Sequence, residues 1–403
     1  MSHEYPMQPL RETPLSYPIW GEEQIDQEAM KQMENSLRLP VSMAGALMPD
    51  AHVGYGLPIG GILATDQVVI PYAVGVDIAC RMRLSIYPES PILIHQKVGQ
   101  FRKALLEQTN FGAGGQWRGK QRSEHEVLDD PAWKTTPLLR SLIDTAQNQL
   151  GTSGSGNHFV EWGEIEINEA NDELGLKAGK YLALLSHSGS RGVGFKIANH
   201  YSKLAMDVRS GLDPAVKHLA WLDLTSYEGQ AYWTSMELAG RFASANHEVI
   251  HKRVAKAVGI KPIAVVENHH NFAWKELIHT ADGEQEAIVH RKGATPAGEG
   301  VYGFIPGSMG DFGFLVRGRG NEASLNSASH GAGRKMSRKG ALNSITTTER
   351  NQYLKARGVE LLGGGLDESP QAYKPIEDVI AAQADLVDIV GRFMPKIVRM
   401  SNK

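Results

Sequence analysis

The stretch VVIPYAVGVDIACRMRLSIY, residues 68–87, indicates two strand-like runs joined by a short turn. Asp77 and Cys80 lie three positions apart where the first run ends. A carboxylate and a thiolate at this spacing can converge on one cation, and a thiolate sulfur can also bridge two metals. The alternative is a free cysteine that is buried only for packing. The stretch therefore has two interpretations, a metal site at the end of a strand or a cysteine buried for packing.

Three more strand-like runs end in histidines beside Gly/Ser loops. They are GSGNHFVEW with His158, SHSGSRGVG with His187, and ENHHNF with His270. Successive N–H groups in such turns can bind an anion, and Arg191 adds a guanidinium suited to phosphate. A single histidine of this kind is more often a packing residue, but the joint pattern favours a metal site. Imidazole and carboxylate suit Mn, Zn, Fe or Ni, whereas a thiolate favours zinc, so the residues leave the metal open.

Two other glycine-rich segments carry reactive side chains. MPDAHVGYGLPIGG, residues 48–61, contains Asp50 and His52, and SASHGAGRKMSR, residues 327–338, contains His330. Neutral imidazole is a competent nucleophile near neutral pH, so a histidine in so open a turn can face a phosphate. The alternative is a histidine that only lines the turn. No GxxxxGK[ST] motif occurs, so a nucleotide would need another cradle.

Composition indicates a folded, reduced protein. The 403 residues are 41% hydrophobic, carry a net charge of −3 and include one cysteine. The N-terminus lacks the basic start and apolar run of a signal peptide, and no run of 18 apolar residues occurs, so we expect a cytoplasmic protein without a membrane span. A protein that coats nucleic acid by bulk charge would be more basic. The candidate local RNA patch is Arg317 to Lys339, with a solvated basic loop as the alternative.

The periodicity predicts an α+β chain. Strands are expected within 43–87, from 180, and at 262–270. Helices are expected at 22–38, 92–108, 137–150, 227–258, 346–358 and 375–393. We expect one domain over residues 1–403, with a motif core at about 48–338 and a helical C-terminal region at about 346–403.

Eight segments in this order resemble the RtcB family of RNA-splicing ligases. They are MPDAHVGYGLPIGG, GVDIAC, GNHFVE, HSGSRG, HHN, HRKGATPA, IPGSMG and SHGAGRKMSR. The resemblance runs from about Met48 to Arg338, and more loosely to the C-terminus. It implies a distinctive α+β fold with mixed β-sheets, surrounding helices and a deep metal-containing cleft that holds two Mn²⁺ ions. The metal ligands that it implies are Asp77, Cys80, His158, His187 and His270, with the cysteine between the ions.

The resemblance also implies a reaction. His330 would attack GTP and carry GMP, which passes to an RNA 3′-phosphate made by opening a 2′,3′-cyclic phosphate. The 5′-hydroxyl of a second RNA end then displaces GMP, as in tRNA splicing or RNA repair. Arg191 would hold an RNA phosphate. The implied guanylate contacts are Asn157, Glu161, Ser308, His330, Gly331, Ala332 and Gly333. The family implies a monomer, and an activating protein is a further partner to test.

Three positions depart from the family pattern. Arg81 follows the cysteine where glycine is usual, which places a bulky cation beside the metal site. Gly313 stands where serine is frequent, which puts one guanylate contact in doubt. The family ends with a lysine that reaches the guanine, and Lys403 is the candidate here.

Other functions remain open from the sequence. A binuclear metal phosphoesterase that acts on cyclic or terminal nucleic-acid phosphates would need the metal ligands but not His330. A non-catalytic RNA-binding protein descended from a ligase would have lost ligands or nucleophile, and here all are present. A ligase for other ends, such as damaged tRNA, rRNA or DNA 3′-phosphates, would share the same motifs.

Overall fold

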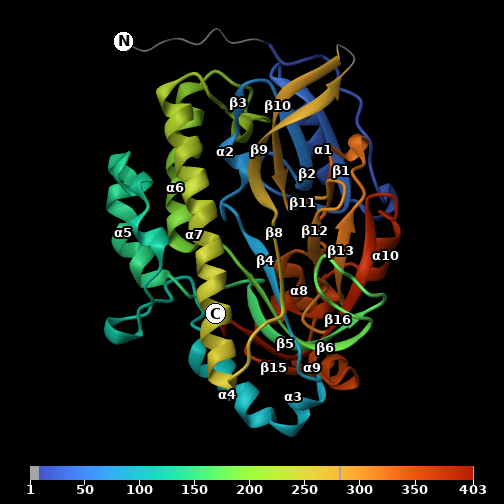
Figure 1. Ribbon diagram of the computed structural model, residues 1–403. Helices are drawn as coiled ribbons and strands as arrows, with labels where there is room; N and C mark the ends of the chain where they lie inside the picture. The colour runs from blue at the N-terminus through green and yellow to red at the C-terminus, as the bar shows by residue number, and fades with distance from the viewer. Residues whose placement is uncertain (1–8, 281–282, 403) are drawn as a thin grey trace.

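A computed structural model describes residues 9–280 and 283–402, and Lys403 lies outside them. Two sheets dominate the α+β architecture (Figure 1). In order across the larger sheet, the strands are β12 (Tyr302–Ile305), β13 (Gly313–Gly318), β16 (Val387–Met400), β5 (Phe159–Ile167), β6 (Gly179–Ser188), β4 (Arg81–Tyr87) and β8 (Ala264–His269), and β15 (Glu360–Leu362) pairs with β16. The second sheet has the order β1 (Ser42–His52), β2 (Ile59–Thr65), β10 (Gly283–Lys292) and β9 (Asn271–Thr280). Two short ribbons pair β11 (Ala294–Pro296) with β14 (Ser327–Ser329), and β3 (Val68–Val69) with β7 (Leu222–Asp223).

Helices surround these sheets. They are α1 (Gln27–Leu37), α2 (Pro71–Val74), α3 (Ile92–Gln96), α4 (Val98–Gln108), α5 (Pro137–Gln149), α6 (Arg191–Val208), α7 (Tyr227–Val258), α8 (Arg338–Ser344), α9 (Thr347–Ala356) and α10 (Ile376–Ala381). Helices α5, α6 and α7 pack side by side as a layer flanking the sheets (Figure 1). Within the described residues, no helix has the length and apolar character to cross a membrane.

Most of the expected elements are confirmed. The helix expected at 227–258 is α7, which begins after the N-cap Ser226 and ends at the left-handed Gly259, as capping preferences require. The expected helices at 22–38, 92–108, 137–150 and 346–358 correspond to α1, α3 with α4, α5 and α9. The strand expected from 180 is β6, and the one expected at 262–270 contains β8.

The helix expected at 375–393 was wrong for its second half. Only Ile376–Ala381 is helical, and Val387–Met400 forms β16, which lies between β5 and β13 in the larger sheet. Gly391 and Pro395 disfavour a helix there, and the β-branched residues around them favour a strand. The C-terminal region is therefore part of the central sheet as well as helical.

Helix α6 was not predicted from the sequence. Its first residue, Arg191, belongs to a Gly/Ser loop that we interpreted only as an anion-binding turn. The loop and the helix are both real, because the helix begins directly at the end of the SHSGS segment. Gly192 and Gly194 lowered its helix propensity, and packing of Val193, Ile197 and Ala198 into the core compensates.

Trp162 on β5 anchors one side of the larger sheet. It is fully buried and packs edge-on against Phe101 of α4, with the ring centroids 5.0 Å apart, and lies 5.7 Å from the Tyr87 ring of β4. These contacts tie a helix and two strands to one side chain.

We predict that Trp162→Ala lowers the free energy of unfolding by about 3–5 kcal/mol, because it removes a large buried ring and leaves a cavity. Urea unfolding followed by circular dichroism measures this change. Phe195→Ala is the control: Phe195 is 53% exposed on α6, and its removal should change the free energy by no more than about 0.5 kcal/mol. Equal effects of the two substitutions would contradict the prediction.

His290 joins the second sheet to the chain before α2. It is fully buried on β10. Its Nδ1–H donates to the carbonyl of Leu63 at 3.1 Å, and its Nε2 accepts from the main-chain N–H of Ile70 at 2.9 Å. One nitrogen donates and the other accepts, so the ring must be neutral. Burial lowers the pKa of His290 to about 4.

This neutral histidine predicts acid sensitivity. An unfolded histidine binds a proton near pH 6.5, whereas the folded ring does not until about pH 4. Its contribution to stability is therefore complete above pH 6.5 and falls by up to about 1.4 kcal/mol per pH unit between pH 6.5 and 4. We expect the difference in unfolding free energy between pH 7 and pH 5 to be smaller for His290→Gln than for the wild type. An unchanged difference would show that His290 does not contribute.

Candidate functional site

The loop before β4 carries the first two candidate ligands. Ala79 has a left-handed backbone, with φ 56°, and its N–H donates to the Asn271 carbonyl at 2.7 Å. The Asn271 side-chain amide in turn donates to the Asp77 carbonyl at 3.2 Å. Asn271 thus fixes the turn that brings Asp77 and Cys80 to the same side. No sequence pattern had assigned it this role, although it directly follows the histidine pair.

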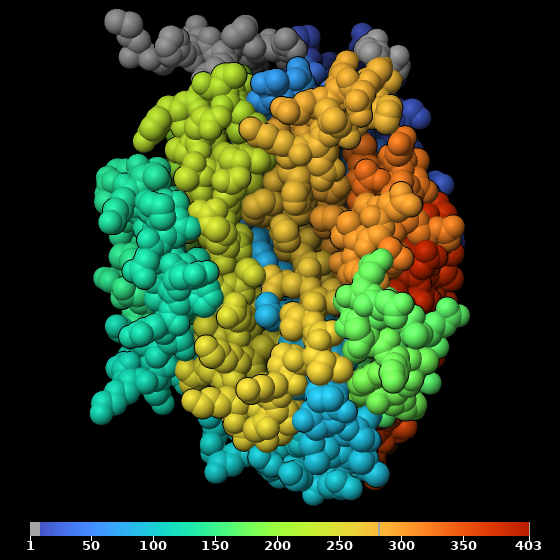
Figure 2. All heavy atoms as spheres, viewed as in Figure 1, coloured from blue at the N-terminus to red at the C-terminus, as the bar shows by residue number. Residues whose placement is uncertain are grey.

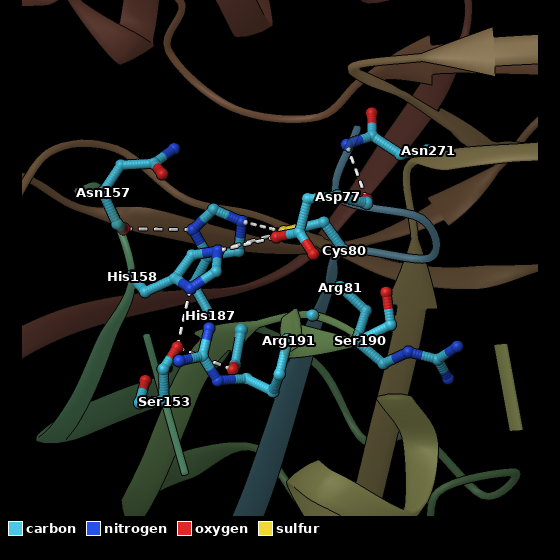
Figure 3. Close-up of polar contacts among 12 residues, drawn as sticks. Asp77, Cys80, Arg81, Ser153, Asn157, His158, His187, Ser190, Arg191 and Asn271 are labelled. Carbon is cyan, nitrogen blue, oxygen red and sulfur yellow. Dashed lines mark hydrogen bonds and ion pairs between the residues drawn. The ribbon is translucent and has the colours of Figure 1, made fainter. Parts of the chain in front are cut away.

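His158 lies beside both of these residues (Figure 3). Its Nε2 is 3.0 Å from Asp77 Oδ2 and 3.5 Å from Cys80 Sγ. Its Nδ1–H donates to the Ser153 carbonyl at 2.6 Å, which fixes the ring with Nε2 toward Asp77 and Cys80. Gly154 allows this approach, because its φ is +100° and a Cβ there would overlap His158 and Arg191.

His187 and His270 complete the cluster from the ends of β6 and β8. His187 Nε2 lies 3.1 Å from Cys80 Sγ and 3.3 Å from His270 Nε2. Its Nδ1–H donates to the Asn157 carbonyl at 3.1 Å, so its Nε2 also points into the cluster with a free lone pair (Figure 3). The structure therefore brings together all five side chains that the sequence suggested as ligands.

The five donors form two groups that share the cysteine. One group is Asp77, Cys80 and His158, and the other is Cys80, His187 and His270, with the donor atoms of each group within 4.8 Å of one another. A sulfur and an imidazole nitrogen bound to one tetrahedral ion at ~2.3 and ~2.0 Å lie about 3.5 Å apart. The donor chemistry and spacing therefore fit two ions with a common sulfur.

Burial sets the protonation of this cluster. It lowers the pKa of His187 and His270 well below the usual value, so both rings are neutral, the form that binds metal. Burial also raises the pKa of the Cys80 thiol well above its usual value, and the Asp77 charge adds to the effect. For Asp77, burial raises the pKa, but its contact with His158 and the charge of Arg191 outweigh burial and hold the pKa of the carboxyl below its usual value.

His330 lies next to this cluster. Its ring centroid is 4.8 Å from that of His270. Its Nδ1 is 2.6 Å from Oδ2 of the fully buried Asp50, which also accepts from the main-chain N–H groups of His330 and Gly331. Lys374, which the sequence had not suggested, donates to the carbonyls on either side of Asp50, at 2.8 and 3.0 Å. The sequence placed Asp50 in a Gly-rich turn, whereas it lies in strand β1, and its role as partner of His330 emerges only from the fold.

The expected guanylate contacts lie in three segments. Asn157 is an exposed residue of the loop whose carbonyl holds His187. Burial raises the pKa of the Glu161 carboxyl on β5 well above its usual value. Ser308 bonds to Asp311 in a separate loop. The turn Gly331, Ala332 and Gly333 follows the nucleophile candidate and is buried.

Arg191 is held by the protein at the start of α6. It is 8% exposed, its Nε donates to Thr152 Oγ1 at 3.1 Å and its Nη2 to the Gly112 carbonyl at 2.9 Å. The remaining terminal nitrogen, Nη1, faces Gly154 of the His158 loop. Arg191 is thus adjacent to the ligand cluster.

The structure adds detail to two sequence expectations. In the basic segment from Arg317 to Lys339, all four arginines form ion pairs, which offset part of its positive charge. They are Arg317 with Glu173, Arg319 with Asp388, Arg334 with Glu368, and Arg338 with Asp367 and Glu368. Gly313 packs directly under the Phe304 ring, so a serine there would collide with it.

The fold and the site define an α+β protein in which two candidate metal-ligand groups share one cysteine beside an aspartate-held histidine. The family profile described as tRNA-splicing ligase RtcB matches residues 32–401. The chain belongs to this family, and membership makes it an enzyme of the ligase class. It is 32% identical over 398 residues to the RNA-splicing ligase RtcB of Escherichia coli K12, covering 91% of this chain and 92% of that protein. It is 29% identical over 437 residues to the tRNA-splicing ligase RtcB of Thermococcus kodakarensis, covering 91% and 89%.

The shared cysteine predicts an unequal response to ligand removal. Cys80→Ala should weaken the binding of both ions by more than about 100-fold. His270→Ala should weaken the binding only of the ion held by the group that contains His270. Titration with Mn²⁺, with free ion counted by electron paramagnetic resonance, measures stoichiometry and affinity. His279→Ala serves as control, because His279 is exposed on β9 and pairs with Glu322. Retention of two ions by Cys80→Ala would rule out the bridging role.

Proposed function

We propose that this protein joins RNA 3′-phosphate or 2′,3′-cyclic phosphate ends to 5′-hydroxyl ends, with GTP and two Mn²⁺ ions, through a GMP adduct on His330. The observation that carries the proposal is the position of His330, held by Asp50 and 4.8 Å, ring to ring, from the candidate ligand His270. We further propose that residues 1–403 act as one ligase domain, as a cytoplasmic monomer, in tRNA splicing or RNA repair.

Asp50 selects the nitrogen of His330 that would react. A carboxylate 2.6 Å from Nδ1 keeps the proton on that nitrogen and leaves the lone pair on Nε2. Because Asp50 also accepts from two main-chain N–H groups, its carboxylate is fixed in place, and rotation of the ring would break the contact between Nδ1 and that fixed carboxylate. This arrangement supports Nε2 as the nucleophile toward the α-phosphorus of GTP.

The ligand cluster would hold the two ions next to that nucleophile. Asp77 with His158 would hold one ion, His187 with His270 the other, and Cys80 would contact both. Manganese would neutralise the triphosphate charge and polarise the α-phosphorus. Reactions of phosphoryl groups depend mainly on such positioning and charge neutralisation, which suits a site of imidazoles, glycine turns and one arginine.

The proposed reaction balances in four steps. Water opens a cyclic phosphate to a 3′-phosphate. His330 Nε2 forms a bond to the α-phosphorus of GTP and pyrophosphate leaves. An oxygen of the RNA 3′-phosphate then forms a bond to the phosphorus of the bound GMP, and the bond between that phosphorus and His330 Nε2 breaks. Finally the 5′-hydroxyl oxygen attacks the activated 3′-phosphate, loses its proton and releases GMP.

The remaining candidate contacts supply binding in this proposal. Arg191 would hold an RNA phosphate with the terminal nitrogen that faces Gly154. The guanylate would contact the turn after His330 and the side chains of Asn157, Glu161 and Ser308. Lys403, the candidate for guanine recognition, lies outside the described residues.

The decisive experiment is labelling of the protein with GTP. We expect the wild type, with Mn²⁺ and GTP labelled at the α-phosphate, to retain acid-labile label on a denaturing gel, because a histidine–phosphorus bond hydrolyses in acid. His330→Ala should retain none. Asp50→Asn should label about 100-fold more slowly, since the ring loses its fixed orientation. Cys80→Ala should also fail, through loss of the ions.

The same preparation distinguishes the alternative enzyme. A binuclear phosphoesterase would remove cyclic or terminal phosphates with Mn²⁺ alone and would keep this activity in His330→Ala. Absence of label on the wild type, together with phosphate release that does not need GTP, would replace the ligase proposal by the phosphoesterase. Labelling without joining of RNA ends would direct the search to other nucleic-acid ends.

A further inference from the structure

A group of charged side chains lies directly behind the ligand cluster, between the larger sheet and α7. Arg81 and Arg83 of β4 point to the same face and share Glu267 of β8. Arg81 Nη1 pairs with one carboxylate oxygen, and Arg83 Nη1 lies 2.6 Å from the other. The side chains are only 6%, 17% and 17% exposed. Charges removed from water are costly, so their placement requires compensating contacts.

Arg81 makes contacts that Arg83 does not. Its Nε donates to the Ala79 carbonyl at 3.2 Å, and its Nη2 donates to the Gly240 carbonyl of α7 at 2.8 Å. One planar guanidinium therefore links the ligand loop, the long helix and the carboxylate of β8. The sequence had suggested a cation beside the metal site, but the guanidinium points away from the imidazoles (Figure 3). It backs the cluster instead of facing it.

The carbonyl that Arg81 contacts belongs to Ala79, the residue that orients Cys80. Ala79 has φ 56°, a backbone conformation that residues other than glycine rarely adopt and that neighbouring contacts must hold. Its N–H is held by Asn271 from one side and its carbonyl by Arg81 from the other. Rotation of this peptide would move Cys80 Sγ, the one donor that both ligand groups contain.

The polar inner face of α7 braces the neighbouring strands in the same way. Ser186, the residue before the ligand His187, bonds to His247 Nδ1 at 2.6 Å and to His251 Nε2 at 2.8 Å. His251 Nδ1 also bonds to Ser85 of β4 at 2.8 Å. In Figure 2 the yellow atoms of α7 lie against the gold atoms of the β8 to β10 segments, and only a narrow furrow shows the blue atoms between them. Ser186, His247 and His251 are all buried.

We propose that Arg81 is a positioning residue for the metal centre, which clamps the Ala79–Cys80 peptide to α7 and Glu267 so that the Cys80 sulfur can serve both ions. The inference rests on the metal centre of the proposed function. Arg83 shares the ion pair, the strand and the face of Arg81 but does not touch the ligand loop, so it provides a matched control.

Cobalt binding to the metal-free protein tests this role without any turnover. Co²⁺ is added to the wild type, Arg81→Met and Arg83→Met, and affinity and stoichiometry are read from the d–d absorption and from the thiolate-to-cobalt charge-transfer band. We expect Arg81→Met to bind Co²⁺ about 10- to 100-fold more weakly, the effect typical of removing a residue that orients a ligand, and to lose charge-transfer intensity per bound ion. Arg83→Met should bind within about threefold of the wild type. The metal-free unfolding free energy of each variant is measured in parallel.

The outcomes separate the two proposals. No binding by the wild type would overturn the metal centre and the inference together. If the wild type binds two ions, two results would overturn only the positioning role of Arg81. One is an unchanged Co²⁺ affinity in Arg81→Met, and the other is an equal loss of Co²⁺ affinity in both variants. If Arg81→Met does not fold, Arg81→Lys replaces it, because lysine keeps the charge for Glu267 but lacks the fork that reaches Ala79 and Gly240. It should show the same loss of cobalt affinity with a native circular dichroism spectrum, and wild-type affinity would overturn the clamp.

Discussion

The sulfur of Cys80 lies at the meeting point of the two candidate ligand groups, and the pairing of three strands brings it there. Strand β4 runs antiparallel to both β6 and β8, so the start of β4 adjoins the ends of its two neighbours. Arg81 is in register with Ser188 on one side and His269 on the other. Cys80, His187 and His270 therefore reach the same edge of one sheet without any long excursion of the chain.

The site is polar on both sides of that sheet edge, which is unusual for a buried region. On one side burial keeps His187 and His270 neutral, and main-chain carbonyls orient His158 and His187. On the other side an arginine pair and a carboxylate replace the apolar packing expected between a helix and a sheet. The contrast with Trp162, which anchors its part of the sheet by apolar contact alone, shows that rigidity is obtained by different means in the two places.

Local patterns in the sequence identified what is local in the structure. The expected strand-end positions are confirmed for His187 and His270, which lie where β6 and β8 end, whereas Cys80 and His158 directly precede β4 and β5. Asp77 follows α2, because the strand expected up to that point ends at Val69. The resemblance supplied the grouping of the five residues. Features that depend on pairing between distant segments were out of reach.

Distant pairing explains the specific errors. The direction of Arg81 depends on which face of β4 meets α7, and the strand character of 387–400 depends on a place between β5 and β13. The partnership of Asp50 with His330 joins positions 280 residues apart. No periodicity carries that information. Lys374 closes the same arrangement from near the C-terminus by holding the two carbonyls that flank Asp50. A chain synthesised only as far as His330 would thus contain the histidine and Asp50 but not Lys374, so the two carbonyls that flank Asp50 would still lack their donor.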